Sequence, residues 1–136
     1  MLGLRRAILP GRGAGVESVR LWRLCGASPT LFRTLVLPHP AGDAVLSLAA
    51  WKGTLLAGKQ GGTIDVWDME SFTPVRVLPA HTKDVLCLQP LAEGDAYVFW
   101  SGGADGEVCR FERSFRCCGR VSARTKDVPC LALPAA

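Results

Sequence analysis

Two short stretches near the middle of the chain carry the apolar pattern of paired β-strands. Thr54–Ala57 is mainly apolar, and Thr63–Asp68 alternates between residues that would face opposite sides of a sheet. Between them lies the glycine pair Gly61-Gly62, which suits the two positive-φ positions of a type I′ turn. The pattern therefore predicts a β-hairpin whose second strand ends in a Trp-Asp pair.

The hairpin pattern recurs along the chain with a period of about 44 residues. Trp67 aligns with Phe111 in one direction and with Trp22 in the other, which are 44 and 45 positions away. A second block has its own copies, because Thr-Lys-Asp-Val begins at Thr82 and again at Thr125, 43 positions later. Short strands with a period of about 40 to 45 residues are typical of four-stranded propeller blades.

The repeated sequence resembles the WD40 repeat family over residues 16–133. The resemblance rests on Gly-Gly-Thr-Ile-Asp-Val-Trp-Asp at 61–68 and on a histidine that precedes each hairpin, at His39 and His81. It implies an all-β fold, an incomplete WD40-type β-propeller of four-stranded antiparallel blades. Closed propellers have about four to eight blades, so the low repeat count predicts a fragment or truncated form of a longer propeller protein.

The repeat positions divide the chain into an N-terminal arm and a repeat region. We expect an irregular basic arm over residues 1–15. The repeat region should contain a partial blade over 16–38, full blades over about 39–80 and 81–123, and the start of a further blade over 124–133. We expect no clear outer strand after Phe111, except over residues 114–117. Pro129 weakens the last strand, since proline cannot donate to a strand ladder.

Composition narrows the class of protein further. The chain has 136 residues, a net charge of +4 and 49% hydrophobic residues, which indicates a folded globular chain. Its longest apolar run is far shorter than the roughly 18 residues of a membrane-spanning helix, so we expect no membrane association. Lys and Arg are spread through the sequence, and the charge therefore does not favour a nucleic-acid partner.

The six cysteines do not form a metal-binding or disulfide pattern. No Cys-x-x-Cys pair occurs, and Cys87 and Cys130 share one repeat position on strands expected to be buried. We therefore expect no cofactor, no metal and a reducing compartment, taken to be the cytoplasm. The first 15 residues contain three arginines and no acidic residue, which leaves a mitochondrial transit peptide open, as well as a nuclear location.

The WD40 resemblance implies a buried hydrogen-bond network in each blade, formed by His, Ser or Thr, Asp and Trp. In the second full blade, His81, Ser101 and Asp105 occupy the first three positions, and Phe111 replaces the Trp. Phenylalanine has no N–H group, so this blade lacks one link. A Ser-His-Asp set could also be a hydrolase triad. No Gly-x-Ser-x-Gly motif surrounds Ser101, which favours the structural role.

The first full blade keeps two members of this network, the His and the Trp. It has His39 and Trp67 at matching positions, whereas Ala57 and Gly61 replace the Ser and the Asp. Neither full blade therefore carries the whole set, and the resemblance implies two differently incomplete networks.

These features favour a non-catalytic scaffold that mediates protein–protein interaction and is not an enzyme. The expected partners are other proteins or peptides, and a second copy of the chain that would complete the propeller. The residues expected to bind partners flank the inner strands of the blades: Trp51, Lys52, Lys83, Asp84, Lys126 and Asp127. The alternative is the propeller portion of a larger enzyme. The run that begins at Leu55 loosely resembles WD-repeat-containing metallopeptidases of glutathione degradation.

Overall fold

The computed structural model describes residues 2–9, 16–24, 27–36, 44–51, 53–93 and 96–132. His39 and Lys52 lie outside these ranges. The chain forms two compact units, Met1–Val45 and Leu46–Ala136.

The first unit is a three-stranded antiparallel sheet in the order β1-β2-β3. Its strands are β1 (Leu2–Leu9), β2 (Val16–Arg23) and β3 (Thr30–Val36). The strand β1 occupies the segment where we expected an irregular arm, and it pairs with β2 along its whole length. Pro10, Gly11, Gly13 and Gly15 all follow Leu2–Leu9 in the sequence, so they do not interrupt this strand.

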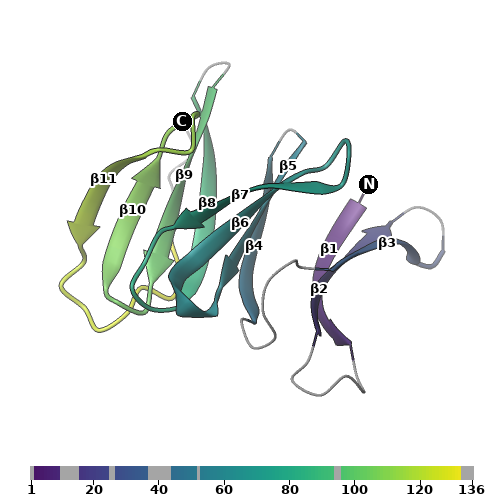
Figure 1. The fold of residues 1–136 in the computed structure, drawn as a ribbon, viewed down its shortest axis with the longest axis horizontal. Coiled ribbons are helices and arrows are strands. Elements are labelled where there is room, and N and C mark those ends of the chain that lie inside the picture. The colour runs from purple at the N-terminus through teal and green to yellow at the C-terminus, as the bar shows by residue number, and fades with distance from the viewer. Residues whose placement is uncertain are drawn as a thin grey trace. The chain divides into compact units, whose positions relative to one another are not determined.

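The second unit contains two successive four-stranded antiparallel sheets (Figure 1). The first blade consists of β4 (Val45–Trp51), β5 (Thr54–Lys59), β6 (Thr63–Asp68) and β7 (Thr73–Pro79). The second blade consists of β8 (Val85–Glu93), β9 (Ala96–Gly103), β10 (Glu107–Phe111) and β11 (Cys117–Ser122). In each blade the strands follow one another in chain order, which confirms the expected all-β fold of antiparallel blades.

Burial of apolar residues between the two blades forms the core of the second unit. On the first blade, Ile64 and Val66 of β6 are 0% and 1% exposed. They pack in one cluster with Phe99, Cys109 and Phe111 of the second blade. The two phenylalanine rings are stacked, with centroids 4.7 Å apart. We call the face of a blade that packs on the following blade its forward face, and the opposite face its rear face.

Both hairpin loops contain three residues. In the first blade Gly58 pairs with Ile64, so the loop is longer than the two-residue type I′ turn that the sequence predicted. Gly61 and Gly62 nevertheless both have positive φ, at 85° and 101°. In the second blade Gly106 has φ 77°, and its N–H donates to Gly103 O at 3.1 Å. A left-handed glycine is typical of a three-residue hairpin loop.

The second blade has a regular outer strand, β11, which begins at Cys117, whereas we expected an outer strand after Phe111 only over residues 114–117. Every residue of β11 is exposed, so the strand lacks the apolar alternation that would reveal it in the sequence. The connection between the paired residues Phe111 and Cys117 is also one residue shorter than the connection between the equivalent pair, Trp67 and Pro74. Phe72 and Phe115 both adopt positive φ in these turns, and they are 43 positions apart, whereas Trp67 and Phe111 are 44 apart.

The segment after β11 continues the contacts between blades without forming a regular strand. Val85 at the start of β8 accepts a hydrogen bond from Ser47 Oγ of the first blade at 3.2 Å. Val128 accepts one from Cys87 Sγ of the second blade at 3.5 Å, and its own N–H donates to Gly103 O at 2.9 Å. Val128 therefore contacts the second blade in the way that Val85 contacts the first blade. Pro129 follows Val128 directly in the sequence.

The close approach of the chain to Gly62 gives a test of this packing. A Cβ atom at Gly62 would overlap the backbone carbonyl of His81, whereas one at Gly53 would meet nothing within 4 Å. Both glycines have positive φ, so both changes to alanine carry backbone strain. We expect Gly53→Ala to cost about 1 kcal/mol, and Gly62→Ala to cost about 1–3 kcal/mol more because of the overlap. Urea unfolding of both variants measures the difference, and equal losses would contradict the packing described.

Candidate functional site

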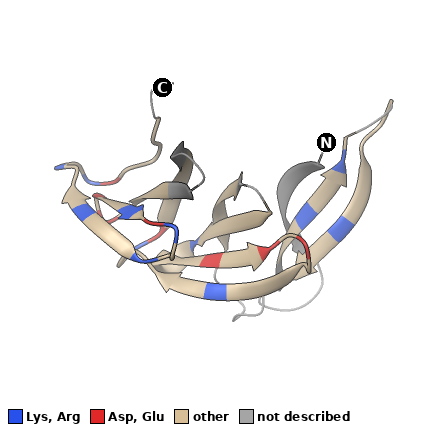
Figure 2. Cartoon of the chain, turned by 90° about the horizontal axis from the view of Figure 1, so that it is seen from above, with Lys and Arg blue, Asp and Glu red and all other residues tan. Residues whose placement is uncertain are grey.

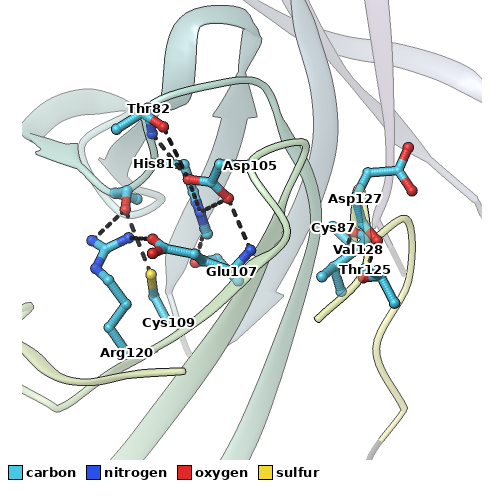
Figure 3. A network of polar contacts seen from close by, with 12 residues as sticks. His81, Thr82, Cys87, Asp105, Glu107, Cys109, Arg120, Thr125, Asp127 and Val128 are labelled. Carbon is cyan, nitrogen blue, oxygen red and sulfur yellow. Dashed lines mark hydrogen bonds and ion pairs between the residues drawn. The ribbon is translucent and has the colours of Figure 1, made fainter. Parts of the chain in front are cut away.

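A buried histidine connects three elements of the second blade (Figure 3). His81 precedes β8, Ser101 lies on β9, and Asp105 lies in the β9–β10 loop. His81 Nε2 lies 2.8 Å from Ser101 Oγ, and Nδ1 lies 3.0 Å from Asp105 Oδ1. An ionised carboxylate can only accept, so in the neutral imidazole Nδ1 donates to Asp105 and Nε2 accepts from the Ser101 hydroxyl.

Asp105 is held in its ionised form by this arrangement. Its carboxylate accepts backbone N–H bonds from Thr82 and Glu107, both at 3.1 Å. Burial alone would raise the pKa of Asp105. The two backbone hydrogen bonds and the interaction with His81 outweigh burial and lower this pKa below its ordinary value of 3.8.

A second set of polar contacts lies beside the histidine and connects β10 and β11 with the loop before β8. Arg120 donates to Glu107 and to the carbonyl oxygen of Ala80, both at 2.6 Å. Cys109 Sγ donates to the same carbonyl at 3.5 Å. Burial raises the pKa of Cys109 to about 11, so this thiol stays protonated at neutral pH. These residues could not be recognised as a set from the sequence, because the cross-strand pair Cys109–Arg120 depends on strand β11.

The His81 network has the connectivity of a catalytic triad but not its access. Ser101 is 0% exposed, so a substrate could not reach its hydroxyl group in this conformation. His81, Asp105 and Glu107 also place metal-ligand-type atoms within 4.8 Å of one another. These groups already bind Ser101, backbone N–H groups and Arg120. The geometry is that of a hydrogen-bond network that fixes the loops at one end of the blade.

The first blade uses a different polar pair. Lys59 Nζ lies 3.2 Å from Asp65 Oδ2, and the two side chains are 2% and 1% exposed. Trp67 is 4% exposed, and its Nε1 has no hydrogen-bond partner among the residues that the structure describes. Ala57 occupies the position of Ser101 and offers no hydroxyl acceptor. This ion pair was not predicted from the sequence, although Lys59 and Asp65 stand on either side of the glycine turn.

Four of the six expected partner-binding residues lie in two equivalent loops, at 83–84 and at 126–127. Lys83 lies exposed between β7 and β8, and Lys126 and Asp127 lie exposed after β11. The side chain of Asp84 accepts the Gly61 N–H at 3.0 Å, so it also orients the first hairpin loop. Trp51 is the last residue of β4, and Lys52 lies outside the described residues.

Comparison with known proteins supports the fold. No family model matches the chain. It is similar to a chain in the crystal structure of the mitotic checkpoint complex, with a TM-score of 0.66 and 19% sequence identity. The match covers 92% of this chain and 37% of that chain, so this sequence spans little more than a third of its structural neighbour. In all, 375 chains of solved structures match this chain significantly.

The fold is therefore an incomplete WD40-type β-propeller with antiparallel four-stranded blades. Within the part of the chain that the structure describes, no helix has the length and apolarity needed to cross a bilayer.

The contacts of Asp105 predict how stability depends on pH. Its pKa is lowered in the folded state, so its stabilisation is present above the unfolded-state pKa and is lost as the pH falls through the folded-state value. We expect Asp105→Asn to reduce the free energy of unfolding at pH 7 by about 1–3 kcal/mol, and to weaken its dependence on pH below about 4. Urea unfolding between pH 3 and 7 measures both effects. Asp127→Asn, an exposed change of the same type, is the control, and equal pH profiles for the two variants would refute this role.

The buried Lys59–Asp65 pair predicts strong coupling between two mutations. Lys59→Met leaves a buried carboxylate without its cation and should cost about 3–5 kcal/mol. Lys59→Met combined with Asp65→Leu removes both charges and should recover most of that loss. Unfolding free energies of both single variants and the double variant give the coupling. Additive losses would show that the two charges do not depend on each other.

Proposed function

We propose that the chain is a non-catalytic scaffold that binds other proteins through the loops at the hairpin end of its blades. The observation that carries this proposal is a duplicated exposed loop. Thr-Lys-Asp occurs at 82–84 and at 125–127, before β8 and after β11, and both lysines are exposed. Two equivalent basic positions one blade apart suit an extended peptide or a protein surface.

The loops are presented by a rigid support. Thr82 N–H donates to Asp105, and Asp84 accepts from Gly61, so the first loop is tied to the hairpins of both blades. On the second loop, Thr125 Oγ1 donates to the carbonyl of Asp127 at 2.8 Å. Binding residues on pre-ordered loops lose less conformational entropy on association. The proposed role of the His81 network is therefore to hold this surface in place.

Two further observations favour protein partners. The structural neighbour is a chain of a protein complex. Figure 2 shows Lys and Arg positions interspersed with Asp and Glu positions along the ribbon of the second unit, and a mixed pattern of this kind does not favour a nucleic-acid partner. The five described cysteines are free, which supports a reducing compartment such as the cytoplasm. Among the described residues we find no observation that favours the metallopeptidase alternative.

Charge reversal in the loops tests the proposal. Lys83→Glu and Lys126→Glu should each reduce recovery of co-purifying proteins from a cell extract by about tenfold, or about 1.4 kcal/mol in affinity. Both side chains are exposed, so stability should change by less than about 0.5 kcal/mol. The readout is quantitative mass spectrometry of proteins captured by the tagged chain.

The control is Arg113→Glu, which makes the same charge change at an exposed position in the turn between β10 and β11. We expect it to retain the proteins that the lysine variants lose. If all three variants capture the same proteins in the same amounts, the loops are not the binding surface.

A further inference from the structure

The strand β11 forms the outer edge of the second blade, as β7 does in the first blade (Figure 1). Each strand stands at the end of its sheet order, so within the described residues no strand pairs with its far edge. Every residue of β11 is exposed. An edge of this kind leaves backbone N–H and C=O groups with which another extended segment can pair. The two edges differ in which of these groups they offer.

The hydrogen bonds near the end of β11 show which of its backbone groups point outward. Ala123 N–H donates to Gly106 O at 2.9 Å, just beyond the last residue of the strand. In an antiparallel ladder only every second residue bonds to a given neighbouring strand. Val121 therefore bonds toward β10, whereas Arg120 and Ser122 direct their N–H and C=O groups away from the sheet.

The beginning of β11 follows the same rule. Glu112 N–H donates to Arg116 O at 3.0 Å, so Arg116 bonds toward β10 and the next residue, Cys117, points outward. A β-bulge within β11 accounts for the wider spacing between this residue and the next outward one. The outer edge of β11 thus offers the N–H groups of Cys117, Arg120 and Ser122.

On β7 two of the equivalent outward positions hold proline. Pro79 is the counterpart of Ser122, and Pro74 is the counterpart of Cys117, because their paired residues on β6 and β10 are equivalent. Proline has no N–H group, and prolines on an edge strand oppose the addition of a further strand. The outer edge of the first blade is therefore blocked, whereas that of the second blade keeps its donors.

The outer edge of the second blade is also basic. Arg116 directly precedes β11, Arg124 follows its last residue by two positions, and both are exposed. Arg116 Nε lies 3.0 Å from Glu112 Oε1, but an exposed pair of this kind contributes little and leaves the arginine able to change partner. Within the strand, Arg120 pairs with Glu107. The positive charge at both ends of β11 favours a partner with acidic side chains.

We propose that the outer edge of β11 binds an extended acidic segment of a partner protein by β-strand addition. Carbonyl groups of the segment accept the outward N–H groups of β11, and its own N–H groups donate to the outward carbonyl groups. Acidic side chains near its two ends pair with Arg116 and Arg124. This surface uses the backbone of an edge strand instead of the Thr-Lys-Asp lysines, and it goes beyond the function proposed for those loops.

A second copy of the chain fits this edge less well. Each β11 carries Arg120 and is flanked by Arg116 and Arg124. Antiparallel pairing of two such strands would bring like charges together across the new edge, and like charges on paired strands are destabilising. We therefore expect no self-association through β11.

Two variants at Ser122 separate the backbone N–H from the side chain. Ser122→Pro removes the outward donor, and β7 accommodates proline at the equivalent position, Pro79. Ser122→Ala keeps the donor, and both changes remove the hydroxyl group that accepts the Arg124 N–H at 3.2 Å. The probe is a fluorescent peptide with a core of six alternating Thr and Val residues, the length of β11, and a pair of Glu residues at each end. We expect Ser122→Pro to bind it at least about tenfold more weakly than Ser122→Ala.

Fluorescence anisotropy of the full chain measures peptide binding, with urea unfolding as the check on the folding of each variant. Arg124→Glu should weaken binding about tenfold at low salt, and so should a peptide with Lys in place of Glu. A peptide whose core amides are all N-methylated has no donors and should not bind, which tests the backbone pairing on the unaltered chain. Lys83→Glu should leave peptide binding unchanged, which separates this proposal from the proposed loop function.

Equal affinities of Ser122→Pro and Ser122→Ala for the Glu peptide would overturn the proposal. Undiminished binding of the N-methylated peptide would do the same, as would a wild-type chain that does not bind the Glu peptide. Sedimentation equilibrium tests the remaining occupant. A wild-type dimer that Ser122→Pro abolishes would identify a second copy of the chain at this edge, in contradiction to the proposal.

Discussion

Burial of one blade's forward face by the rear face of the next is the interaction on which the second unit depends. An isolated four-stranded sheet would leave Ile64 and Val66 in water, and the stacked pair Phe99 and Phe111 removes them from it. The glycines of the hairpin loops then allow the backbone of the next blade to approach closely. The polar contacts act on this packed frame, because they tie down loops whose strands are already placed.

The two blades stabilise the hairpin end in different ways. The second blade uses an imidazole between a hydroxyl and a carboxylate, and backbone N–H groups satisfy the remaining oxygen atoms. The first blade encloses a lysine and an aspartate and leaves an indole N–H without a described partner. The His81 network, through Asp105 and the Thr82 N–H, fixes the loop that carries the exposed Lys83, and this links the fold to the proposed role in protein binding.

Much of the fold could be predicted from the sequence, because the strands of the first blade alternate clearly and the hairpin glycines mark their ends. The placement of His81, Ser101 and Asp105 relative to one another follows the repeat positions. Strand β11 could not be predicted, since all of its residues are exposed and the connection from Phe111 to its partner Cys117 is one residue shorter than the repeat implies. The contacts of Arg120 depend on that strand and were missed with it.

The different polar sets have a consequence for how the repeats can change over time. Asp65 and Cys109 occupy equivalent positions, but one pairs with a lysine and the other donates to a carbonyl. Copying either residue alone into the other blade would bury a group without its partner. The two repeats are therefore no longer exchangeable residue by residue. Each network forms a unit that can be gained, lost or transferred between repeats only as a whole.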